Sequence, residues 1–84
     1  MDYRIAVCDD EQIFIDRIRQ ILLDCEIRGF TDSRQLLQAV EAGERYDVIF
    51  LDIAMPGLDG IGLAREIRET DEDVVIVFVT SRTL

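Results

Sequence analysis

The chain of 84 residues contains no histidine, no lysine and no tryptophan, so all nine of its basic residues are arginines. The absence of histidine excludes histidine-based acid–base catalysis and histidine metal sites. The chain has 18 acidic residues and nine arginines, so its net charge is −9. This negative charge disfavours nucleic acid and anionic membranes as direct partners. The same charge suits a divalent cation or a basic protein surface.

Cysteine and long apolar runs are also scarce. Cys8 and Cys25 have no metal-ligand spacing, and we interpret both as reduced core thiols. Residues 1–4 open no signal peptide, and no apolar run approaches the roughly 20 residues of a membrane span. We therefore expect a cytoplasmic protein without membrane contact, and the length predicts one small domain over residues 1–84.

Short apolar runs predict β-strands at residues 4–8, 47–52 and 74–79, and a weaker run predicts another at 26–30. The run at 74–79 reads VVIVFV, six apolar residues in succession. Such runs are typical of strands that are buried on both faces of a parallel sheet.

Helical patterns separate these runs. The first spans residues 11–25, and its apolar side chains form one stripe: Phe14, Ile18, Ile21, Leu22 and Cys25. The second begins at Asp32, a predicted N-cap with Gln35 as its capping-box partner, and Gly43 can end it. The third covers about residues 60–69.

The alternation of strands and helices predicts an α/β fold with a parallel sheet and right-handed crossovers. Suppose that strand 26–30 lies on one side of strand 4–8, and that strands 47–52 and 74–79 lie on the other. The first helix then covers one face alone, and the other two helices cover the opposite face. In such sheets ligands bind at the carboxyl ends of the strands that flank the reversal of direction, here strands 4–8 and 47–52.

Carboxylates stand at both of these strand ends. Asp9 and Asp10 follow strand 4–8, and Asp52 ends strand 47–52. Three such carboxylates repel one another, which raises the pKa of at least one, and a hard divalent cation such as Mg²⁺ or Mn²⁺ removes the conflict. The alternative is that Asp10 or Glu11 merely caps the following helix.

Two neighbouring segments add to the predicted site. After Asp52, the pair Pro56-Gly57 predicts a tight turn, and Asp59 can cap the third helix. Thr80 and Ser81 follow the last strand, where their hydroxyls could donate to a phosphoryl oxygen or simply end the strand.

Together, the segments AVCDDE, FLDIAMPGLDG and FVTS resemble the receiver domain of two-component response regulators, and their wording is closest to receivers of LytTR-type regulators. The resemblance implies a flavodoxin-like, doubly wound parallel sheet, truncated to four strands in the order 2-1-3-4 with three helices. It implies that Asp52 accepts a phosphoryl group from a sensor histidine kinase. Mg²⁺ would be bound by Asp10, Asp52 and the backbone carbonyl of Ala54, with Asp9 assisting, and Thr80 would close on the phosphoryl oxygen.

The sequence also departs from the family pattern. A full receiver continues through a fourth helix, a fifth strand and a fifth helix, and the phosphate-binding lysine at the end of that strand has no counterpart here. Arg82 is too close to Thr80 to replace it, so we expect phosphorylation at Asp52 to be slow. An alternative function is a signalling-inactive interaction or dimerisation module. An aspartate-dependent phosphatase would need a second acid where Ala54 stands.

The last strand suggests self-association. Without a further neighbour, the run at 74–79 presents an apolar edge that no proline or charge interrupts. We therefore expect a homodimer, joined through this edge or through the uncovered face of the sheet.

Overall fold

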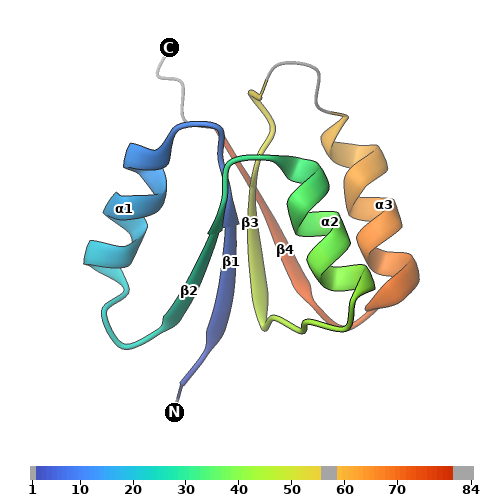
Figure 1. Ribbon diagram of the computed structural model, residues 1–84, viewed down its shortest axis with the longest axis horizontal. Helices are drawn as coiled ribbons and strands as arrows, with labels where there is room; N and C mark the ends of the chain where they lie inside the picture. Colours follow the sequence, from blue (N-terminus) through green and yellow to red (C-terminus); the bar gives the residue numbers. More distant parts are fainter. Residues whose placement is uncertain (1, 56–58, 81–84) are drawn as a thin grey trace.

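The computed structural model describes residues 2–55 and 59–80 and consists of one parallel sheet between two layers of helices (Figure 1). The strands are β1 (Arg4–Cys8), β2 (Glu26–Phe30), β3 (Val48–Asp52) and β4 (Val75–Val79). They lie in the order β2-β1-β3-β4, and every neighbouring pair is parallel. The supposed strand order is therefore confirmed, and the fold is flavodoxin-like.

Three helices alternate with the strands: α1 (Gln12–Ile21), α2 (Ser33–Glu41) and α3 (Gly60–Thr70). Figure 1 shows α1 on one face of the sheet, and α2 and α3 together on the other. The core is split accordingly. A small cluster around Ile15 packs under α1, and a larger one that includes Leu36, Leu51 and Ile67 lies beneath α2 and α3.

The first helix is shorter than its apolar stripe predicted. It ends at Ile21, so Cys25 lies beyond it in the connection to β2 and not on a helical face. Ile21 is 75% exposed, whereas Ile15, which the predicted stripe omitted, is fully buried. A Cβ added at Gly29 would lie 2.5 Å from Cγ2 of Ile15, so the glycine allows this isoleucine to reach the sheet. Three residues of the predicted stripe, Ile18, Leu22 and Cys25, are partly buried against the same cluster as Ile15.

The other two helices begin at the predicted caps. The side chain of Asp32 accepts a hydrogen bond from the backbone N–H of Arg34 at 2.9 Å, and that of Asp59 accepts one from Gly62 at 3.0 Å. The backbone N–H of Gln35 donates to the backbone carbonyl of Asp32 and not to its side chain, so the predicted capping box is not formed among the described residues. Gly43 follows α2 with a φ of 106°, a conformation that favours glycine.

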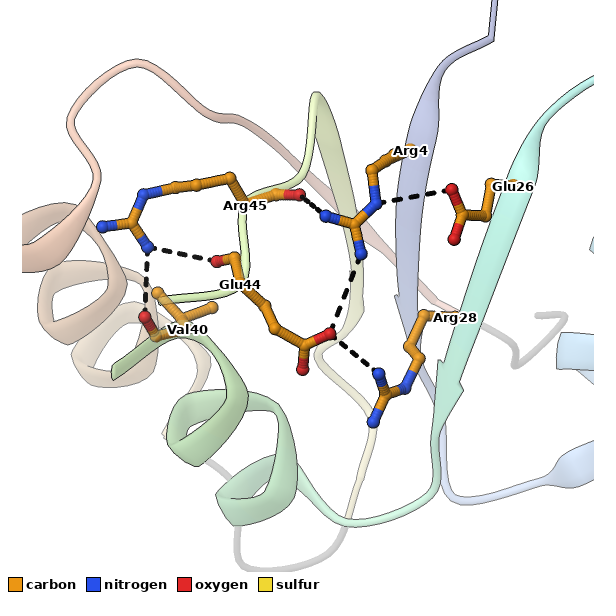
Figure 2. A network of polar contacts seen from close by, with 6 residues as sticks. All are labelled: Arg4, Glu26, Arg28, Val40, Glu44 and Arg45. Atoms are coloured by element: carbon orange, nitrogen blue, oxygen red, sulfur yellow. Dashed lines mark hydrogen bonds and ion pairs between the residues drawn. The ribbon is translucent and has the colours of Figure 1, made fainter. Parts of the chain in front are cut away.

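Ion pairs join β1 and β2 to the connection between α2 and β3 (Figure 2). The guanidinium of Arg4 lies 3.4 Å from Glu26 and 3.7 Å from Glu44, and that of Arg28 lies 2.8 Å from Glu44. Arg4 also donates to the carbonyl of Arg45 at 2.8 Å. Because these side chains are partly exposed to solvent, each pair contributes less than about 1 kcal/mol to stability.

The outermost strand β4 is less covered than its sequence predicted. Val75 is 54% exposed and Phe78 is 46% exposed. The expectation of a strand buried on both faces is therefore wrong for the part of the chain that the structure describes. Among the helices of that part, none is long and apolar enough to cross a membrane.

Candidate functional site

Three aspartates meet where β1 and β3 end. Cys8 pairs with Leu51 in the parallel register, so Asp9, the next residue, lies beside Asp52. The backbone N–H of Asp9 donates to the carbonyl of Phe30 at 3.0 Å, which also ties this point to the end of β2. One carboxylate oxygen from each of Asp9, Asp10 and Asp52 lies within 4.8 Å of the other two. The predicted convergence at the switch point is confirmed.

The three carboxylates differ in exposure. Asp9 is 3% exposed, Asp52 is 0% exposed and Asp10 is exposed. Each buried carboxylate accepts a backbone hydrogen bond from the residue two positions on. Glu11 donates to Oδ1 of Asp9, and Ala54 donates to Oδ1 of Asp52, both at 2.8 Å. These bonds orient the two side chains and satisfy one oxygen of each.

Burial raises the pKa of Asp9 from 3.8 to about 6. The negative charges of Asp52 and Asp10 make smaller contributions to this increase, and the hydrogen bond from the backbone N–H of Glu11 offsets part of it. A cluster of carboxylates that resists ionisation in this way gains from a bound cation. The donors are oxygen atoms only, which fits Mg²⁺ or Mn²⁺ better than zinc.

The alternative interpretation, in which Asp10 or Glu11 caps α1 through its side chain, is not supported. The N-cap position of α1 is Glu11, and its side chain makes no capping hydrogen bond. Asp10 lies before the cap, and its carboxylate belongs to the acidic cluster. The sequence could not show this difference, because both residue types are common at helix starts.

A pair of sulfur atoms lies beneath the cluster. Sγ of Cys8 is 4.0 Å from Sδ of Met55, and both residues are buried. Burial, with the charge of Asp9 second, raises the pKa of the Cys8 thiol to about 12. Cys8 is therefore a protonated core thiol and not a nucleophile, and Cys25 is also free, as expected for both.

The comparison with known families decides what this geometry means. The model of the response regulator receiver domain matches residues 5–83. The chain belongs to this family. As a receiver domain of two-component response regulators, it carries its acidic cluster at the carboxyl ends of β1 and β3.

Curated relatives of this receiver are regulators from several organisms. It is 33% identical to the response regulator MprA of Mycolicibacterium vanbaalenii, over 98% of this chain and 36% of the relative. It is also 33% identical to stress response regulator protein 1 of Scheffersomyces stipitis, over 98% of this chain and 30% of the relative. The chain thus spans about a third of the length of these relatives.

Solved structures agree with the fold. The response regulator TrrA of Thermotoga maritima, in complex with Mg²⁺ and BeF, is 32% identical with a TM-score of 0.82, over 96% of this chain and 71% of that one. TrrA has also been solved in complex with the histidine kinase ThkA, where it is 31% identical with a TM-score of 0.80, over 98% of this chain and 72% of that one.

The remaining predicted residues lie around the cluster or outside the described chain. Asp52 pairs with Val79 in the register of β3 and β4, so Thr80 follows at the same edge of the sheet and is exposed. Pro56, Gly57, Ser81 and Arg82 lie outside the described residues. The backbone donors of Glu11 and Ala54 were not predicted from the sequence. The sequence feature that could have indicated them is an aspartate at the end of a strand, because such a side chain often accepts a hydrogen bond from the backbone N–H two residues later.

Proposed function

We propose that this receiver accepts a phosphoryl group on the carboxylate of Asp52, and that Mg²⁺ is held by Asp9, Asp10, Asp52 and the backbone carbonyl of Ala54. The observation that supports this most directly is the convergence of three carboxylates, two of them buried, at one edge of the sheet. When bound, the cation would neutralise the carboxylates and the charge on the phosphoryl oxygens.

The transfer itself is a displacement at phosphorus. A carboxylate oxygen of Asp52 forms a bond to phosphorus as the phosphorus–nitrogen bond of a phosphohistidine breaks, and the imidazole leaves and takes up a proton. The N–H of Ala54 holds the Asp52 carboxylate in place through Oδ1. Because Asp10 is the exposed member of the cluster, the donor approaches on its side. Thr80, at the adjoining strand end, supplies a hydroxyl to a phosphoryl oxygen.

The donor in this proposal is a sensor histidine kinase. The complex of TrrA with ThkA supports a kinase as the partner, since that regulator is similar to this chain over nearly its whole length. In this role the chain is a phosphoacceptor and not an enzyme with a separate substrate. An aspartate-dependent phosphatase would place a second acid two residues after the nucleophile, and that position is Ala54, which offers only backbone groups.

Phosphorylation by acetyl phosphate tests the assignment. With Mg²⁺ present, intact-mass spectrometry should show one added phosphoryl group on the unaltered chain and none on Asp52→Asn. Asp16→Asn is the matched control, because Asp16 is an exposed aspartate on α1 with no place in the acidic cluster. An adduct that persists in Asp52→Asn would refute the assignment of the phosphoacceptor.

Thermal unfolding tests the metal site separately. A ligand that binds only the folded state stabilises it by RT ln(1 + [L]/Kd). Millimolar Mg²⁺ should therefore raise the melting temperature of the unaltered chain, and Asp10→Ala and Asp52→Ala should each reduce that increase. A melting temperature that does not respond to Mg²⁺ would remove the metal from the proposal and leave the fold assignment intact.

A further inference from the structure

The chain leaves β3 through three residues that are each held at a different point. The backbone N–H of Ile53 donates to the carbonyl of Val79 at 3.0 Å. The backbone N–H of Ala54 donates to Oδ1 of Asp52 at 2.8 Å. The side chain of Met55 is buried in the larger core cluster, beneath α2 and α3. This short segment is therefore restrained at each of its three residues.

The side chain of Met55 is held by contact with the end of β1. Its Sδ lies 4.0 Å from Sγ of Cys8, which is also buried. A methionine side chain is unbranched and flexible, so its position depends on the contacts around it. Cys8 is the last residue of β1 and directly precedes Asp9 and Asp10. The contact between the two sulfur atoms therefore links the segment after β3 to the strand that carries the other two carboxylates of the cluster.

The carbonyl of Ala54 belongs to the peptide bond that joins this residue to Met55. Because a peptide bond is planar, the direction of the carbonyl is set by the backbone torsions on its two sides. The hydrogen bond to Asp52 restrains the Ala54 side, and the buried side chain restrains the Met55 side. A change at Met55 therefore acts on the direction of this carbonyl without removing any carboxylate.

We propose that Met55 is a positioning residue of the metal site: packed against Cys8, it fixes the direction of the Ala54 carbonyl and so raises the affinity for Mg²⁺. This inference rests on the proposed metal site. Neither sulfur atom is a ligand, because Mg²⁺ takes oxygen ligands and demands near-ideal octahedral geometry. The same demand makes binding sensitive to a small rotation of one ligand. Changes at groups that orient metal ligands typically weaken binding by about 10–100-fold.

Titration with MgCl₂, followed by isothermal titration calorimetry, tests this role. Met55→Ala should bind Mg²⁺ about tenfold more weakly than the unaltered chain. Met55→Leu conserves most of the side-chain volume and should restore the affinity. Cys8→Ala should weaken binding in the same direction, and adding it to Met55→Ala should weaken binding no further, because both changes act through one contact. Should Met55→Ala not fold, Cys8→Ala decides the question in the same way, since it removes only one sulfur atom.

Val40→Ala is the matched control for a general loss of stability. Val40 lies on α2, is 2% exposed and belongs to the same core cluster as Met55. Like Met55→Ala, it should lower the melting temperature without metal, yet it should keep the Mg²⁺ affinity of the unaltered chain. Unchanged affinity in Met55→Ala, or equal weakening in Val40→Ala, overturns the positioning role and leaves the metal site in place. An unaltered chain that binds no Mg²⁺ overturns the metal site and this inference together.

Discussion

The substitution Asp9→Asn should stabilise this receiver when no divalent cation is present. Asp9 is buried, and its pKa is raised from 3.8 to about 6. A shift of about 2 units corresponds to about 3 kcal/mol of unfavourable free energy when the carboxylate is ionised in the folded state. Asparagine keeps the oxygen that accepts from Glu11 but buries an extra amide, which costs about 1–2 kcal/mol. The net gain is therefore about 1–2 kcal/mol at neutral pH.

The pH dependence follows from the same shift. Because the folded state holds the Asp9 proton more tightly than the unfolded state, the unfolded chain binds fewer protons between about pH 4 and pH 6. The free energy of unfolding should fall as the pH rises through this window and change little above it. In Asp9→Asn that fall should be absent, so the variant and the unaltered chain should differ most above pH 6.

Urea unfolding, followed by circular dichroism in EDTA at pH 4 and pH 7.5, measures both effects. Asp10→Asn is the matched control, since Asp10 carries the same charge at an exposed position and should change stability by less than about 1 kcal/mol. The reasoning is refuted if Asp9→Asn is less stable than the unaltered chain at pH 7.5, or if the two chains keep the same pH dependence.

Two further predictions concern the packing. Gly29→Ala should lower the free energy of unfolding by about 1–3 kcal/mol in urea, because the new Cβ would lie 2.5 Å from Ile15; an unchanged midpoint would show that Ile15 moves freely. A thiol reagent should modify Cys25 and not Cys8 in the folded chain, and both in urea, because Cys8 is buried with a pKa of about 12. Rapid modification of Cys8 in the folded chain would contradict this.

The sequence predicted the strands and the acidic cluster because both depend on local patterns. Apolar runs located β1, β3 and β4 to within one residue, and the order of elements placed Asp9 and Asp52 at neighbouring strand ends. The end of α1 was predicted wrongly because Leu22 and Cys25 continue the apolar stripe and pack against the same core cluster as Ile15, although both lie beyond the last helical residue. The chain leaves the helix at Leu22, where φ is −103° and ψ is 62°.

Differences within the cluster could not be predicted either. Asp9 and Asp10 are adjacent and chemically identical, yet one is buried and the other is exposed. That difference depends on the hydrogen bond from the backbone N–H of Asp9 to the carbonyl of Phe30 and on the turn into α1, which are tertiary features.

The ion pairs at the amino end of the sheet also give the molecule an electrical polarity. There, Arg4 and Arg28 offset Glu26 and Glu44, whereas the carboxylates of Asp9, Asp10 and Asp52 lie close together at the carboxyl end. The field of such an arrangement runs along the strands and draws cations toward the acidic end. Added salt screens this attraction over about 10 Å at 0.1 M. Mg²⁺ should therefore associate with the cluster more slowly as the ionic strength rises.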